Sequence, residues 1–133
     1  GGCRYSRSGS PGRVRDDGVN RPTCTRGDVW LINFNPGPGS EQRGIRPALI
    51  IQNDIGNRYG ATTIVAAITT TLKEYPVTVF LDSYHSGLKT KSIVNLAQLL
   101  TIDRARLRRR LGEVSDELMR RVDGAISVSL GLS

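Results

Sequence analysis

The stretch RGDVWLINFNPGPGSEQRGIRPALIIQND, residues 26–54, decides the fold of this chain. Its first part, Asp28–Phe34, is rich in β-branched and aromatic residues and predicts a strand. Residues 35–44 carry proline and glycine at a density that prevents a regular ladder, so they predict a long loop. Pro47–Asn53 predicts a second strand, which opens on its proline. A strand, a loop and a strand in this order indicate an antiparallel pair.

Three more strands are expected further along the chain. The run Thr-Ile-Val-Ala-Ala-Ile-Thr within residues 60–71 is rich in β-branched residues and predicts a central strand. Residues 77–81 and 92–100 predict a fourth and a fifth strand. Because strands come first and helices follow, the pattern predicts a mainly β, α+β domain built as a small β-barrel.

The last third of the chain changes to helical spacing. Asp103 is expected to cap a short helix over residues 104–111. Ser115 is expected to cap a second helix, whose first turn holds two acidic residues. The first helix is expected to turn a solvated face of arginines to water, namely Arg104, Arg106 and Arg108–Arg110. The apolar face of the second is expected to be Leu118, Val122, Ala125, Ile126 and Leu130.

The first 25 residues differ in composition from the rest. They are rich in Gly, Ser, Arg and Pro and contain no Leu, Ile, Phe or Met. Such a segment cannot bury enough apolar area to offset its ordering entropy. Residues 1–25 are therefore expected to be a disordered tail or an appended remnant, and residues 26–133 the folded domain. Cys3 and Cys24 are expected to be incidental thiols, since a disulfide between them would form only under oxidation.

The net charge of this 133-residue chain is strongly positive. The sequence has 19 Lys and Arg against 12 Asp and Glu, a net charge of +7, and most of the basic residues are arginine. An arginine-rich surface favours an anionic partner such as nucleic acid or an acidic protein, although excess charge also serves solubility alone. The length suits one domain. No apolar stretch is long enough to span a bilayer and no signal-peptide core follows the N-terminus, so neither a membrane protein nor a secreted disulfide scaffold is expected.

Several common catalytic sites are absent from the sequence. Residues 37–42 lack the third glycine of a dinucleotide turn, and there is no Walker motif, no HExxH and no set of Cys and His for zinc. No metal and no cofactor are therefore expected. The only histidine, His85, is expected to be an exposed bystander. What remains is the polar loop GSEQRGIRP, residues 39–47, which is either a functional loop carried by a sheet or an ordinary solvated turn.

This loop and its surroundings resemble the MazF/PemK toxins of bacterial type II toxin–antitoxin modules. The resemblance covers essentially all of residues 26–133 and none of the tail. Its motifs stand in the family's order and spacing. They are Arg26–Trp30, Pro36, Gly39–Asp54, Asn57, Ile64–Thr69, Gln98, Thr101–Asp103 and Ile126–Leu132.

The resemblance implies a fold and an activity. The fold would be the CcdB/PemK-like toxin fold, an SH3-like barrel with appended helices. The activity would be that of a homodimeric, metal-independent endoribonuclease, which cleaves single-stranded mRNA in the cytoplasm at specific sequences and is inhibited by an acidic cognate antitoxin. Two alternatives stay open: a toxin of the same fold that acts on DNA gyrase, and a non-catalytic RNA-binding barrel.

The resemblance also implies the residues of the site. The catalytic pair would be Arg46, which precedes a proline, and Thr69, at the end of the central strand. Arg46 would neutralise the charge that grows on phosphorus as the RNA 2′-OH attacks, and Thr69 would hydrogen-bond a phosphate oxygen. Because a guanidinium stays protonated, Glu41 is a more natural base. The RNA-binding residues would be Ser40, Gln42, Arg43, Ser92 and Gln98, although a structural hydrogen bond is an alternative role for Gln98. Contact with RNA or the antitoxin is an alternative role for the solvated arginines at positions 104, 106 and 108–110.

Overall fold

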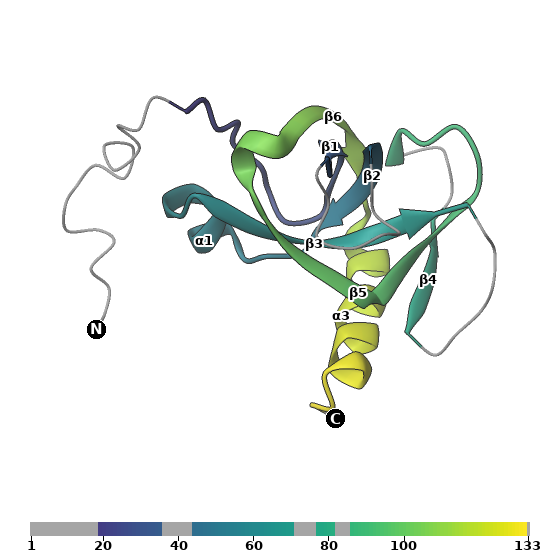
Figure 1. Ribbon diagram of the computed structural model, residues 1–133. Coiled ribbons are helices and arrows are strands. Elements are labelled where there is room, and N and C mark those ends of the chain that lie inside the picture. Colours follow the sequence, from purple (N-terminus) through teal and green to yellow (C-terminus); the bar gives the residue numbers. More distant parts are fainter. Residues whose placement is uncertain (1–18, 36–43, 71–76, 82–85, 133) are drawn as a thin grey trace.

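One curled, antiparallel sheet organises the protein (Figure 1). The computed structural model describes residues 19–35, 44–70, 77–81 and 86–132. The sheet has six strands in the order β4-β5-β3-β2-β1-β6. The strands are β1 (Asp28–Asn33), β2 (Ile45–Ile50), β3 (Thr62–Thr69), β4 (Thr78–Leu81), β5 (Ser92–Asp103) and β6 (Leu107–Glu113).

The mainly β, α+β class is confirmed, but the described strands do not close into a barrel. β4 and β6 stand at the two ends of the strand order, and no ladder joins them. The sheet curls because its registers shift: β5 has extra residues opposite Ala66 and Ala67, and the β1–β6 ladder is irregular at two places. Extra residues of this kind bend a strand and increase its twist.

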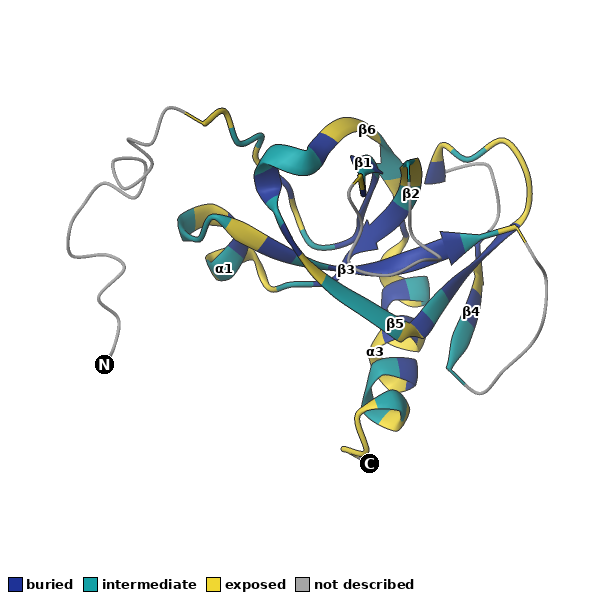
Figure 2. Ribbon diagram, viewed as in Figure 1, coloured by how far each residue is buried: buried dark blue, intermediate teal, exposed yellow. Residues whose placement is uncertain are grey.

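Two buried clusters lie on opposite faces of the sheet, as strand alternation requires. Val29 and Leu49 are cross-strand partners in the first, and Trp30 and Ala48 in the second. We call the first the α3-side cluster, because the helix α3 (Asp116–Ser129) packs on it through β4 and β5. We call the second the Trp30 cluster. Figure 2 shows the resulting continuous burial along the central strands.

The prediction of a helix over residues 104–111 is wrong. Asp103 does cap a turn, since its carboxylate accepts from the Ala105 N–H at 2.8 Å. Only the single 3₁₀ turn Arg104–Arg106 follows, and Leu107–Glu113 is strand β6. A helix here would leave the N–H and C=O groups of β1 unpaired along one edge. Pairing with β1 satisfies them and buries Leu107 in the Trp30 cluster.

The helical ends follow local capping signals. The Ser115 hydroxyl accepts from the Leu118 N–H, as expected for the start of α3. Val122 and Ala125 of the expected apolar face are buried, whereas Leu130 lies past the helix end and is exposed. A short helix that was not expected, α1 (Asp54–Tyr59), is capped by Asn53 where a strand was predicted to end. In the described portion of the chain, no helix combines the length and apolar character that crossing a bilayer requires.

Residues 19–25 are part of the packed structure, although the sequence assigned them to the tail. Arg21 makes a two-pronged salt bridge with Asp103, at 2.8 and 3.0 Å. The buried guanidinium of Arg104 donates to the Pro22 carbonyl at 2.6 Å. Cys24 is buried in the Trp30 cluster, and this burial raises the pKa of its thiol. Polar and ionic contacts therefore order a segment that lacks large apolar side chains, while residues 1–18 lie outside the described residues.

Replacing Arg21 tests whether its ion pair with Asp103 anchors residues 19–25 to the domain. The hydrogen bond from Arg21 holds the pKa of the Asp103 carboxyl below its usual value of 3.8. A carboxylate whose pKa is depressed on folding stabilises the protein above its unfolded pKa and stops doing so as the pH falls through its folded pKa. Arg21→Gln should therefore lower the free energy of unfolding by about 1 kcal/mol at pH 7, and the loss should shrink below about pH 4. Urea unfolding at several pH values measures both.

The control for Arg21→Gln is Arg120→Gln, which removes the same charge from the exposed face of α3. It should leave the unfolding free energy within about 0.5 kcal/mol of the parent. A loss for Arg21→Gln that stays constant from pH 7 to pH 3 would show that the ion pair with Asp103 is not its source.

Candidate active site

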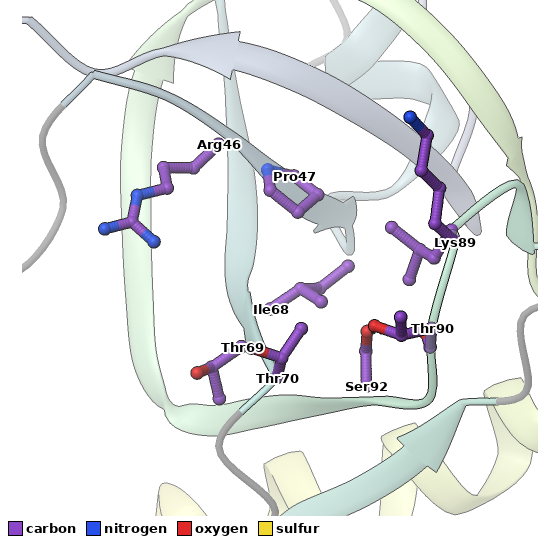
Figure 3. A pocket seen from close by; sticks show the side chains of 9 residues that line it. Arg46, Pro47, Ile68, Thr69, Thr70, Lys89, Thr90 and Ser92 are labelled. Atoms are coloured by element: carbon purple, nitrogen blue, oxygen red, sulfur yellow. The ribbon is translucent and has the colours of Figure 1, made fainter.

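A hollow of about 340 Å³ opens at one end of the sheet. Its walls are the ends of β2 and β3 and the segment that leads into β5 (Figure 3). Such a volume lies at the lower end of the range for small-molecule sites. The residues that line it are Arg46, Pro47, Ile68, Thr69, Thr70, Leu88, Lys89, Thr90 and Ser92.

Strand register brings Arg46 and Thr69 together. β2 and β3 pair through Ala48 and Ala67, and the same register continued by two residues places Arg46 opposite Thr69. Cross-strand partners share a face, so the two side chains emerge on the same side of the sheet. Arg46 is exposed and Thr69 is half-buried. Figure 3 shows both on the same side of the hollow, with Pro47 and Ile68 forming its floor.

The loop before Arg46 is clamped at its base. The Asn35 amide oxygen accepts from the Gly44 N–H at 2.9 Å, and the Gly44 carbonyl accepts from the Phe34 N–H at 2.8 Å. Gly44 has φ +77°, a conformation that favours glycine. These bonds fix the point where the chain enters β2, two residues before Arg46.

Gly87 fixes the opposite wall of the hollow. Its φ is +76°, and a Cβ at this position would lie 2.0 Å from the carbonyl oxygen of Leu111 in β6. Only glycine permits so close an approach. Leu88 packs against the α3-side cluster, and the Ser92 hydroxyl donates to the Thr90 carbonyl at 3.1 Å. The wall therefore has a fixed path from β6 to the start of β5.

The structure brings together three of the site residues that the sequence indicated, Arg46, Thr69 and Ser92. Ser92 is buried and its hydroxyl is engaged by the wall itself, which gives it a structural role in addition to the predicted one. Gln98 lies in the bulged part of β5, outside the hollow. The remaining four, Ser40, Glu41, Gln42 and Arg43, lie outside the described residues.

Sequence reasoning missed Lys89, Pro47 and Ile68 as site residues. Pro47 and Ile68 were counted only as strand residues, and no local signal shows that a strand end will form the floor of a cavity. Lys89 has a weak signal, because Lys89 and Lys91 flank Thr90 just before a strand. In the described portion of the chain, no group of three or more His, Cys, Asp or Glu side chains could hold a metal ion.

The chemistry that this arrangement supports is the binding of an anion beside a small apolar surface. Arg46 and Lys89 supply positive charge, and the hydroxyls of Thr69 and Thr90 supply hydrogen bonds. A guanidinium matches the geometry of a phosphate in two-pronged contacts. The floor of Pro47 and Ile68 offers an apolar surface to a flat group next to that phosphate.

Comparisons with known proteins agree with the resemblance seen in the sequence. A family model described as "PemK-like, MazF-like toxin of type II toxin-antitoxin system" matches residues 25–130. Endoribonuclease EndoA of Bacillus subtilis (strain 168) is 45% identical over 109 residues, which cover 80% of this chain and 94% of that protein.

Solved structures agree as well. A mycobacterial endoribonuclease in complex with its cognate antitoxin superposes with a TM-score of 0.71 at 27% identity, over 84% of this chain and 98% of that one. MazF from Deinococcus radiodurans superposes with a TM-score of 0.67 at 29% identity, over 84% of this chain and 98% of that one.

Two glycine substitutions test the wall of the hollow. Gly87→Ala should lower the free energy of unfolding by about 2 kcal/mol or more, because the new methyl meets the Leu111 carbonyl and φ is positive. Gly124→Ala should raise it by about 0.5–1 kcal/mol, because Gly124 lies within α3 with open space around it. Urea unfolding of the two variants and the parent measures both. Equal stability of Gly87→Ala and the parent would contradict the described path of the wall.

Proposed function

Because this chain belongs to the PemK-like, MazF-like toxin family of type II toxin–antitoxin systems and is an endoribonuclease toxin, we propose that it cleaves single-stranded mRNA at the hollow beside Arg46 and Thr69. One observation carries the choice of site: the ends of two adjacent strands hold these side chains opposite each other, on one face. A phosphate placed between them would meet a guanidinium and a hydroxyl at once. Cleavage at specific sequences would follow from which bases the surrounding walls accept.

The proposed reaction uses the RNA's own 2′-OH as the nucleophile. The 2′ oxygen forms a bond to phosphorus while the bond from phosphorus to the 5′ oxygen breaks, which leaves a 2′,3′-cyclic phosphate and a 5′-OH. The proton of the 2′-OH passes to a base, for which Glu41 is the proposed group, and the leaving 5′ oxygen takes up a proton from water. Holding the 2′-OH in line with the leaving oxygen supplies much of the rate.

The roles of the two described residues follow from their chemistry. Arg46 would stabilise the charge that develops on the phosphate oxygens, and it has two parallel N–H groups to offer them. Thr69 would donate its hydroxyl to one of the same oxygens. Every step of this reaction is carried by protein side chains, water and the RNA itself, and none needs a metal ion or another cofactor.

The proposed partners are a second copy of the chain and an acidic antitoxin. The antitoxin complex among the similar structures supports the second partner. A net charge of +7 also favours a carboxylate-rich segment over a basic one. Such a segment would inhibit by occupying the surface that binds RNA phosphates. Since mRNA is the substrate, the cytoplasm is the proposed place of action.

Cleavage of a mixed-sequence single-stranded RNA in the presence of EDTA tests the proposal. Arg46→Ala and Thr69→Ala should each lower the cleavage rate at least about 100-fold, because each removes a group that stabilises the transition state. Thr62→Ala, at the far end of the same strand, and Arg120→Ala, on α3, are the controls and should cut like the parent. End-group analysis should find a 2′,3′-cyclic phosphate, and an all-DNA copy should stay intact.

The outcome also separates the alternatives. If the folded, antitoxin-free protein binds RNA but cuts none, it is a binding barrel. If it neither binds nor cuts RNA, a toxin of this fold that acts on gyrase becomes the hypothesis to test. Cutting that survives Arg46→Ala and Thr69→Ala would move the catalytic site elsewhere.

A further inference from the structure

The positive side chains of the described residues fall into two groups. In the first, each guanidinium is used to hold the fold. Arg106 donates to the Asn33 and Asn35 carbonyls, and Arg110 bonds the buried Asp28 carboxylate. Arg104 and Arg21 are engaged at the anchor of residues 19–25. These side chains cannot turn to a ligand without breaking the structure that they stabilise.

The second group consists of exposed side chains, namely Lys91, Arg108, Arg120, Arg121, Lys89 and Arg109. Lys89 and Arg109 make no hydrogen bond or ion pair with any other residue in the described ranges. Their charges are therefore not neutralised by a described neighbour. Exposed, uncompensated cations next to a hollow are available to an anionic ligand.

Strand register places Arg109 on the face that carries the floor of the hollow. Arg109 pairs with Leu31, and Leu31 pairs with Pro47, so the three side chains share one face. Two strand spacings, about 10 Å, separate the backbones of Arg109 and Pro47. Arg110 emerges on the opposite face, beside its partner Trp30, which explains why one arginine is structural and its neighbour is not.

Lys89 reaches the same region from the wall of the hollow. Gly87 lets that wall pack closely against Leu111, which is two residues along β6 from Arg109. In Figure 3, Lys89 and Arg46 stand on opposite sides of the hollow with Pro47 between them. We call Lys89 and Arg109 the cationic rim.

We propose that the cationic rim binds RNA phosphates next to the one that is cleaved, an inference that rests on the proposed function. Arg46 emerges on the Trp30-cluster face, beside its partner Ile32, whereas Arg109 emerges on the face of Pro47. Because the two arginines emerge on different faces, we assign them to different phosphates. An RNA strand that leaves Arg46 crosses Pro47 in the floor and its cross-strand partner Leu31, and presents its following phosphates to Lys89 and Arg109.

Contacts of this kind have a recognisable signature. They hold the strand equally in the ground state and the transition state, so their loss raises KM and leaves kcat nearly unchanged. Each phosphate contact to a single strand also releases counterions, which adds about 0.7 to the slope of log affinity against log salt concentration.

The experiment compares the parent with Lys89→Gln, Arg109→Gln and the double variant. The control is Arg120→Gln, which removes an equal charge from an exposed position on α3. Binding is measured at several NaCl concentrations, with an RNA that carries a 2′-deoxy group at the cleaved nucleotide and so cannot react. Cleavage of the matching all-ribose RNA provides kcat and KM. Unchanged thermal midpoints verify that the variants are folded.

Each rim variant should reduce the salt slope by about 0.7 and raise KM about 3- to 10-fold, while kcat changes less than twofold. Arg109→Lys should restore the slope. Shortening the RNA on the side that reaches the rim should abolish the difference between the parent and the double variant, and shortening it on the other side should not.

The two proposals fail in different ways. If the parent cuts RNA but the rim variants behave like Arg120→Gln, the cationic rim is overturned and the proposed function stands. A loss of kcat at constant KM would also overturn the rim as a binding surface. If the parent neither binds nor cuts the RNA, the proposed function itself is wrong, and the rim falls with it.

Discussion

The site depends on the close approach of Gly87 to the Leu111 carbonyl. This contact joins the connection that follows β4, one edge strand, to β6, the other edge strand. The two ends of the curled sheet are therefore connected by close packing, without a ladder between them. The hollow lies between this connection and the ends of β2 and β3, so its shape follows from the same approach. A side chain at position 87 would push the two walls apart.

The described arginines have two different roles: some stabilise the fold, and others present their charge to solvent. Some satisfy partly buried backbone carbonyls or a buried carboxylate, as Arg104 does for the Gly60 and Pro22 carbonyls and Arg110 does for Asp28. An unsatisfied group of this kind would cost free energy on burial. Others, such as Arg109, remain available to an anionic partner. The positive charge available to RNA is therefore smaller than the net charge of +7, because several of the arginines are bonded to groups of the protein itself.

The expected strands were predictable because β-branched residues and their alternation act locally, and β1, β3 and β4 lie where the sequence indicated them. The Ser115 cap was predictable for the same reason. The wrong prediction of a helix over residues 104–111 shows where such local patterns fail. Asp103 begins a turn there, but the following residues pair with the free edge of β1 and form β6. That edge is far away in sequence, so no local pattern in the arginine run predicts the pairing of β6 with β1.

By itself, the sequence determined the class of fold, the family and the identity of Arg46 and Thr69 as a pair worth testing. Those conclusions depend on residue types at fixed spacing, which a sequence displays directly. Only the tertiary structure decided that Arg46 stands opposite Thr69, that residues 19–25 belong to the packed domain, and that Arg109 emerges on the face of Pro47 while Arg110 does not. Each of these depends on the register of strands distant in sequence. Register is set by how whole faces of the sheet bury their side chains together, and it is not written in any one segment.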